Sequence, residues 1–161
     1  MDRTTRRADH VEALQRTLAM VVRRTVVPRV HERIVALAGV EIEQVEAVAL
    51  SRLADAQGMR LGELAQQLRV DCSTASRHVS RLVERGLARR EPDPLDARAV
   101  VLTATAAGQR LIRRLRAAHC QLLDERLATW SDDDLRALVG LTGRLVDDLA
   151  ALTDGTEPAL A

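Results

Sequence analysis

Apolar residues recur at the helical period along most of the chain and divide it into a series of amphipathic helices. The first pattern runs from about Asp9 to Ala38. A kink or a short break is expected near residues 25–27, because Pro28 removes a helical hydrogen bond and disfavours helical geometry at the residue before it. Gly39 is expected to end this segment. Two shorter helices are predicted next, over about residues 41–56 and 61–68.

The stretch from Val70 to Leu87 shows the clearest division into two faces. One face is apolar and is formed by Ala75, Val79, Leu82 and Val83. The other face is polar and is expected to contact DNA through Ser73, Thr74, Ser76, Arg77, Ser80 and Arg81. Hydroxyl groups and first-turn N–H groups suit phosphates, and guanidinium groups suit guanine edges. Together with the short helix before the turn 69–71, this stretch predicts a helix-turn-helix whose second helix enters a major groove.

A β-hairpin is predicted after Gly86, because the β-branched run 99–103 follows a tip rich in Pro and Asp over 92–98. Beside a helix-turn-helix, such a hairpin is a wing. Arg98 is expected to enter a narrow minor groove from this wing. Asp96 is expected to support the wing, either by stabilising its turn or by orienting an arginine.

The rest of the chain is predicted to be helical, with one helix that begins at Thr103 or Thr105 and a last helix over 135–152. Ser131 and Asp134 have the spacing of a capping box before that last helix. We therefore expect a mainly α fold with a small β-wing. Residues 41–103 are expected to form a DNA-binding lobe. Residues 1–38 and 104–161 are expected to form a helical dimerisation region. The apolar stripes of the terminal helices would pair in a homodimer.

Composition limits the possible classes of protein. The chain has 161 residues, 47% of them apolar and 29% charged, which suits a globular protein with a substantial core. All 24 basic residues are Arg and the net charge is only +1, so DNA contacts would have to gather on one face. No stretch resembles a signal peptide or a membrane span, and two cysteines make no disulfide framework. A cytoplasmic location and no membrane partner are expected.

The same residues argue against an enzyme. No pair of His or Cys has the spacing of metal ligands, and neither a phosphate-binding glycine loop nor a nucleophile motif is present, so no metal, cofactor or catalytic residue is expected. Cys72 begins a helix, which favours a reactive thiol, but its helical phase points to the packed face and favours a structural role. His78 lies between the faces and is compatible with packing, solvent exposure or DNA contact. The competing function is a winged helix that binds only proteins.

Four motifs in order along the chain resemble the MarR (multiple antibiotic resistance regulator) family of transcription factors. They are residues 39–44, 61–65 and 73–77, and the wing motif Asp-x-Arg followed by an apolar strand over 96–103. The resemblance implies a homodimer of winged-helix subunits on double-stranded DNA, with dimer contacts from the terminal helices and often a sensor site between the lobes. Pro28 departs from the family pattern.

On this basis we expect a repressor that binds a pseudo-palindromic operator and is released by a small anionic or phenolic effector. The effector cleft is expected between the first helix, the helix over 41–56 and the start of the helix after Thr105. Its candidate ligand residues are Arg23, Arg24 and His31.

Overall fold

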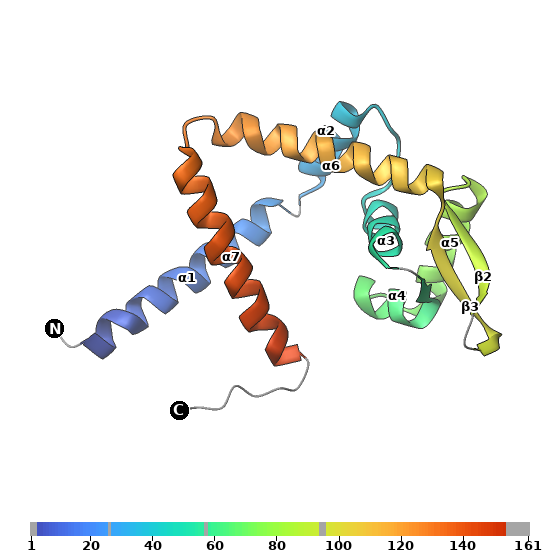
Figure 1. Ribbon diagram of the computed structural model, residues 1–161, viewed down its shortest axis with the longest axis horizontal. Coiled ribbons are helices and arrows are strands. Elements are labelled where there is room, and N and C mark those ends of the chain that lie inside the picture. The colour runs from blue at the N-terminus through green and yellow to red at the C-terminus, as the bar shows by residue number, and fades with distance from the viewer. Residues whose placement is uncertain (1–2, 26, 57, 94–95, 154–161) are drawn as a thin grey trace. The chain divides into compact units, whose positions relative to one another are not determined.

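The computed structural model describes residues 3–25, 27–56, 58–93 and 96–153 (Figure 1). The chain divides into two compact units, residues 1–121 and residues 122–161, which are described separately. Helices dominate both units, and the first also holds a small antiparallel sheet. The predicted mainly α fold with a β-wing is confirmed.

The first helical pattern forms two helices, α1 (Arg3–Thr25) and α2 (Pro28–Ala38), so the predicted break is present. Pro28 occupies the first turn of α2, where its missing N–H group is not needed. Gly39 ends α2 in the left-handed conformation, with φ of 60°. Arg114 stabilises this end, because its Nη2 donates a 2.6 Å hydrogen bond to the carbonyl of Ala38. Helix α1 begins earlier than predicted, since no proline or glycine interrupts its polar first turns.

Three helices build the core of the first unit, namely α3 (Gln44–Asp55), α4 (Leu61–Leu68) and α5 (Cys72–Glu84). The largest fully buried side chains all come from them: Leu50, Leu53, Leu64, Val79 and Leu82. Helix α3 begins three residues later than predicted, because Glu43 is extended at the N-cap position and the preceding Ile42 is buried. The turn between α4 and α5 places their apolar faces against the same core, as expected of a helix-turn-helix.

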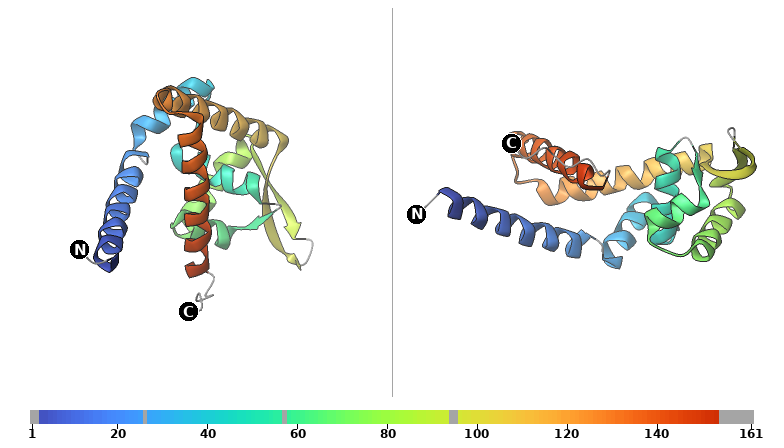
Figure 2. Two further views of the ribbon diagram at one scale, coloured as in Figure 1. Left: turned by 60° about the vertical axis from the view of Figure 1, so that its left-hand side comes forward. Right: turned by 90° about the horizontal axis from the view of Figure 1, so that it is seen from below.

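The sheet contains β1 (Met59–Arg60), β2 (Ala88–Asp93) and β3 (Asp96–Ala104) in the order β1-β3-β2, with antiparallel pairing throughout. Strands β2 and β3 form the predicted wing, which lies beside α5 (Figure 2). Regular pairing extends to Pro92 and Val100. After a register shift Asp93 also pairs with Asp96, so the strands reach further into the predicted tip than expected. The two-residue strand β1 was not predicted, because its length carries no periodicity. Asp93 is buried and accepts two hydrogen bonds from Arg60, at 2.6 and 2.9 Å.

Helix α6 (Ala106–Leu127) starts directly after the wing. Thr105 caps it, since its Oγ1 accepts a 3.1 Å hydrogen bond from the amide of Gly108. The second unit contains α7 (Asp132–Thr153), and the predicted capping box before it is present. The amide of Asp134 donates to Ser131 Oγ at 3.1 Å, and the amide of Ser131 donates to Asp134 Oδ2 at 3.2 Å.

Candidate nucleic-acid interface and effector pocket

The polar face of α5 is organised at its first turn by Asp71. This side chain accepts hydrogen bonds from the amide and the hydroxyl of Thr74, both at 2.8 Å, and from the hydroxyl of Ser73. These donors, led by Ser73, hold the pKa of the Asp71 carboxyl well below its usual range. Sequence reasoning placed Ser73 and Thr74 on the DNA-contacting face and missed Asp71 as the N-cap residue, although aspartate is among the preferred N-cap residues. The two hydroxyls therefore support the cap and lie where a phosphate could approach the helix start.

Arg77 is an exposed arginine in the middle of this face. Its Nη2 donates a 3.1 Å hydrogen bond to Thr74 Oγ1, which directs the guanidinium toward the N-terminal end of α5. In helix-turn-helix proteins, residues near that end contact base edges. Arg77 is therefore an exposed guanidinium held near the N-terminal end of α5.

Arg81 lies one turn further along α5 and is held by two glutamates at the start of α3. Its Nη1 is 3.0 Å and 3.1 Å from the two carboxylate oxygens of Glu43 and 3.3 Å from Oε1 of Glu46. Glu46 is almost fully buried and also accepts a hydrogen bond from Nη1 of Arg85 at 3.3 Å. Arg85 donates a further hydrogen bond to the carbonyl of Glu41. This ion-pair cluster fastens α5 to the start of α3.

His78 is half-buried, and its Nδ1 has no hydrogen-bond partner among the described atoms. Glu43, Glu46 and His78 bring possible ligand atoms within 4.8 Å of one another. The guanidinium groups of Arg81 and Arg85 already occupy these carboxylates. The cluster is therefore explained as an ion-pair network.

The remaining predicted contact residues of α5 are less exposed than expected. Ser76 and Ser80 are both half-buried. Ser80 Oγ accepts a 3.0 Å hydrogen bond from Nη2 of Arg90 in β2. Ser80 thus ties the helix to the wing, because it lies on the side of α5 that β2 covers. Its contact with DNA remains a prediction.

The wing carries Asp96 and Arg98 in the first half of β3, opposite the end of β2. Their side chains lie outside the described part of the structure, so their roles remain predictions. At the base of the wing, Thr103 accepts a 3.1 Å hydrogen bond from Nε of Arg89 and donates one of 2.8 Å to Glu91. These contacts across the two strands stiffen the hairpin.

Cys72 is exposed, and so is Cys120. The prediction that Cys72 faces the packed side is wrong. Cys72 is the first residue of α5, and the first turn of this helix lies outside the core. The buried residues of α5 begin at Ala75 and continue with Val79. Helical phase alone does not report where along the helix the core begins.

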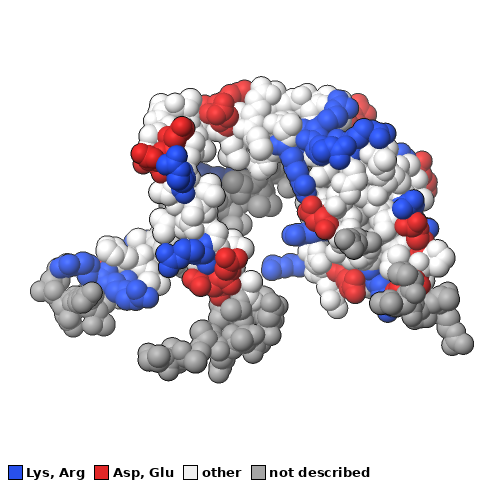
Figure 3. Space-filling view, viewed as in Figure 1, with Lys and Arg blue, Asp and Glu red and all other residues white. Residues whose placement is uncertain are grey.

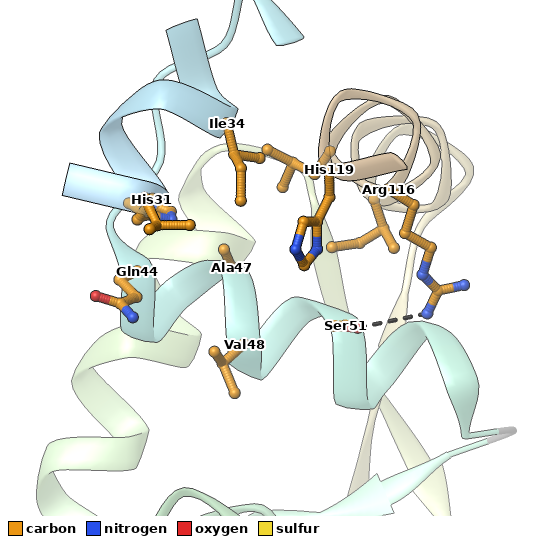
Figure 4. Close-up of a pocket in the computed structure, with 11 residues that line it drawn as sticks. His31, Ile34, Gln44, Ala47, Val48, Ser51, Arg116 and His119 are labelled. Carbon is orange, nitrogen blue, oxygen red and sulfur yellow. Dashed lines mark hydrogen bonds between the residues drawn. The ribbon is translucent and has the colours of Figure 1, made fainter. Parts of the chain in front are cut away.

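A pocket of about 280 Å³ lies between α2, α3 and α6 of the first unit (Figure 4). Its walls are mostly apolar, formed by Val30, Ile34, Ala47, Val48, Ile112 and Leu115. Its polar lining comes from His31, Gln44, Ser51, Arg116 and His119. In Figure 4, His31, Ile34 and His119 face the space between the three helices, whereas the guanidinium of Arg116 points toward Ser51. An apolar pocket with a few converging polar groups is the usual form of a small-molecule site.

The pocket lies where the sequence predicted a cleft, but its lining differs in part. His31 lines the pocket, and its Nε2 lies 2.8 Å from the carbonyl oxygen of Ile42. Since a carbonyl oxygen can only accept a hydrogen bond, Nε2 is the donor. Arg23 and Arg24 are exposed in the last turn of α1 and do not line it. The break before Pro28 ends α1, so of the two helices formed by the first helical pattern only α2 contributes to the pocket. The arginine in the lining is Arg116, bound to Asp55 at 2.6 Å and Ser51 at 3.4 Å.

Charges of both signs are interspersed over the face of the molecule shown in Figure 3. Such a surface offers only modest non-specific attraction to DNA. Among the described helices, none has the length and apolarity needed to cross a membrane.

Two helices joined by a short turn, α4 and α5, followed by the β2–β3 hairpin, define a winged helix-turn-helix protein. The MarR family model matches residues 42–100, which span α3, the helix-turn-helix and the wing as far as Val100 in β3. A transcriptional regulator of the helix-turn-helix type from Mycobacterium tuberculosis is 35% identical over 103 residues, which are 62% of this chain and 72% of that protein. A similar regulator from Mycobacterium leprae is 34% identical with the same coverage.

The fold is also similar to that of a MarR family protein from Bacillus stearothermophilus. The TM-score is 0.70 at 22% identity, with 93% of this chain and 99% of the other chain covered. The chain therefore belongs to the MarR family and is a DNA-binding transcriptional regulator. Members of this family bind DNA as dimers.

Proposed function

We propose that this chain is a homodimeric repressor that binds a pseudo-palindromic operator and is released by a small effector. The observation that carries the proposal is the polar face of α5, which presents Arg77 from a capped helix beside a wing. Ser73, Thr74, Ser76, Arg77 and Arg81 would contact the major groove, and Arg98 the minor groove. Asp96 would support the wing, and Ser80 would act through its bond to Arg90.

Exposed apolar faces on the terminal helices support the homodimer. Helix α1 exposes Val11, Leu14, Leu18, Met20, Val21 and Val22. Helix α7 separately exposes Leu138, Val139, Leu141, Val146 and Leu149. So many exposed large apolar side chains on two helices favour an interaction surface. A two-fold dimer would hold two copies of α5 about 34–36 Å apart, one turn of the double helix.

The pocket supports the proposed release by an effector. Helix α3 contributes Gln44 and Ala47 to the pocket, while Glu43 and Glu46 at its start hold α5. A molecule that shifts α3 would therefore shift the recognition helix as well. Histidine and arginine side chains suit a carboxylate or a phenolate. A ligand that prefers the non-binding form by about 1–3 kcal/mol would lower operator affinity roughly 5- to 150-fold.

Selection of binding sites from random duplex DNA with the purified protein tests the DNA-binding part. We expect an inverted repeat whose half-sites are separated by about one helical turn. Recovery of no preferred sequence, with no binding even at low salt, would favour the alternative of a protein-interaction module, because true phosphate contacts strengthen as salt falls.

Titration of small aromatic carboxylates and phenols into the protein–operator complex tests the effector part. The matched variants are His31→Ala, which alters the pocket lining, and Arg24→Ala, which alters an arginine outside it. Release that is lost only in His31→Ala would support the pocket. Equal loss in both variants would place the effector elsewhere.

A further inference from the structure

The ion pair between Glu43 and Arg81 joins a residue at the start of α3 to a residue proposed to contact DNA. The two side chains are 63% and 52% exposed, so both lie at the surface. Exposed ion pairs contribute little to stability and can exchange partners at low cost. A guanidinium held in this way can leave its carboxylate when a stronger acceptor approaches.

Glu46 differs from Glu43 in burial, although both contact Arg81. Its side chain is only 3% exposed and lies between Arg81 and Arg85. A buried carboxylate with two guanidinium partners resists rearrangement, because breaking the pairs leaves a desolvated charge. Glu46 thus holds α5 to α3 through both Arg81 and Arg85, whereas Glu43 offers an exposed acceptor that a DNA phosphate or base can replace.

We propose that Glu43 is a specificity-determining residue, which competes with DNA for the guanidinium of Arg81. In the free protein Glu43 holds Arg81 against α3, and at the operator Arg81 exchanges this carboxylate for an acceptor on DNA. Contact between Arg81 and DNA requires breaking the pair with Glu43. DNA that presents no good acceptor to Arg81 does not compensate for this loss and is therefore bound less tightly. This inference rests on the proposed docking of α5 in the major groove.

The test is a double-mutant cycle between Glu43→Gln and Arg81→Ala, measured as affinity for the selected operator duplex at fixed salt. Removing any acidic charge near DNA strengthens binding, so Glu84→Gln is the matched control. Glu84 lies on α5 and lines the same groove as Glu43 and Arg81, without a described hydrogen bond to Arg81. We expect Glu43→Gln to bind about two- to five-fold more tightly than Glu84→Gln.

In the Arg81→Ala background this difference should disappear, because no guanidinium remains to be released. Thermal unfolding separates the two glutamates, since Glu46→Gln should lower the melting temperature and Glu43→Gln should leave it nearly unchanged. A gain for Glu43→Gln equal to that of Glu84→Gln, or one that persists without Arg81, would overturn the inference. Failure of the unmodified protein to bind any duplex would instead overturn the proposed function.

Discussion

The hydroxyl of Thr105 donates a 2.7 Å hydrogen bond to the carbonyl of Gly86 and accepts one from the amide of Gly108. One side chain therefore joins the end of α5 to the start of α6. Thr105→Val keeps the shape but removes both bonds, and should lower the free energy of unfolding by about 1–2 kcal/mol. Denaturant unfolding measures this. Thr105→Ser keeps the hydroxyl and should lose much less; equal losses would mean that the methyl group matters more.

Gly108 lies against the same connection, and its hydrogen faces the Leu87 carbonyl. A Cβ added at Gly108 would be 2.1 Å from that oxygen and 3.0 Å from Leu50 Cδ1. Gly108→Ala should therefore destabilise the protein by about 1–3 kcal/mol or more, since backbone must move. Gly62→Ala in α4 is the control, because nothing lies within 4 Å of its added Cβ. It should be neutral or stabilising by up to about 1 kcal/mol, as judged from melting curves.

Periodicity and turn residues predicted most of the helical framework. The bounds of α4 and the start of α5 followed from one apolar stripe and a short turn, because local sequence determines both. Contacts between distant segments could not be predicted in the same way. Glu43 and Arg81 are 38 residues apart, and a helical pattern shows which face is polar without showing what lies opposite. The same limit applies to Ser80, whose partner Arg90 belongs to the wing.

Asp71 should make stability depend on acid pH. Its folded pKa is depressed below the usual value of 3.8, so its contribution is present above that value and is lost as pH falls toward the folded pKa. The melting temperature of Asp71→Ala should lie below that of the unmodified protein at neutral pH, and the two should converge below about pH 4. Asp71→Asn can still cap the helix but cannot titrate. The difference in melting temperature between Asp71→Asn and Asp71→Ala should therefore stay constant with pH. A difference that changed with pH would contradict the role of the Asp71 carboxylate.

Arg77→Ala should weaken operator binding by about 1–3 kcal/mol and relax preference at one position of each half-site, if its guanidinium reads a guanine. Arg77→Lys keeps the charge and loses the planar pair of donors. Binding measured on the operator and on single-position variants distinguishes the roles. Full rescue by lysine would indicate a phosphate contact, which lowers affinity for all sequences alike.

Arg98→Ala should act differently, because its proposed site is a minor groove. The loss of affinity should be greatest for duplexes with A·T-rich flanks, whose minor grooves are narrow. Competition between duplexes that differ only in those flanks measures the effect. Equal loss on all flanks would remove Arg98 from groove recognition.

Leu149→Asp should dissociate the proposed dimer. Leu149 is 48% exposed in the single chain, so aspartate there costs the fold of α7 little and would bury a charge only in a dimer. Sedimentation at micromolar concentration should show a monomer, and operator affinity should fall because half the contacts are lost. Asp147→Ala, also exposed on α7, is the control. A monomeric unmodified protein would exclude this arrangement.

Trp130 is the only tryptophan in a chain without tyrosine or phenylalanine, and it lies 45% exposed just before α7. Ultraviolet fluorescence of the whole protein therefore arises at one position, close to the start of a helix proposed to meet a second copy. The recognition helix and the wing contain no fluorophore of their own. The emission of this protein thus works as a built-in local probe: a change on dilution reports the surroundings of the α6–α7 turn, without any attached label.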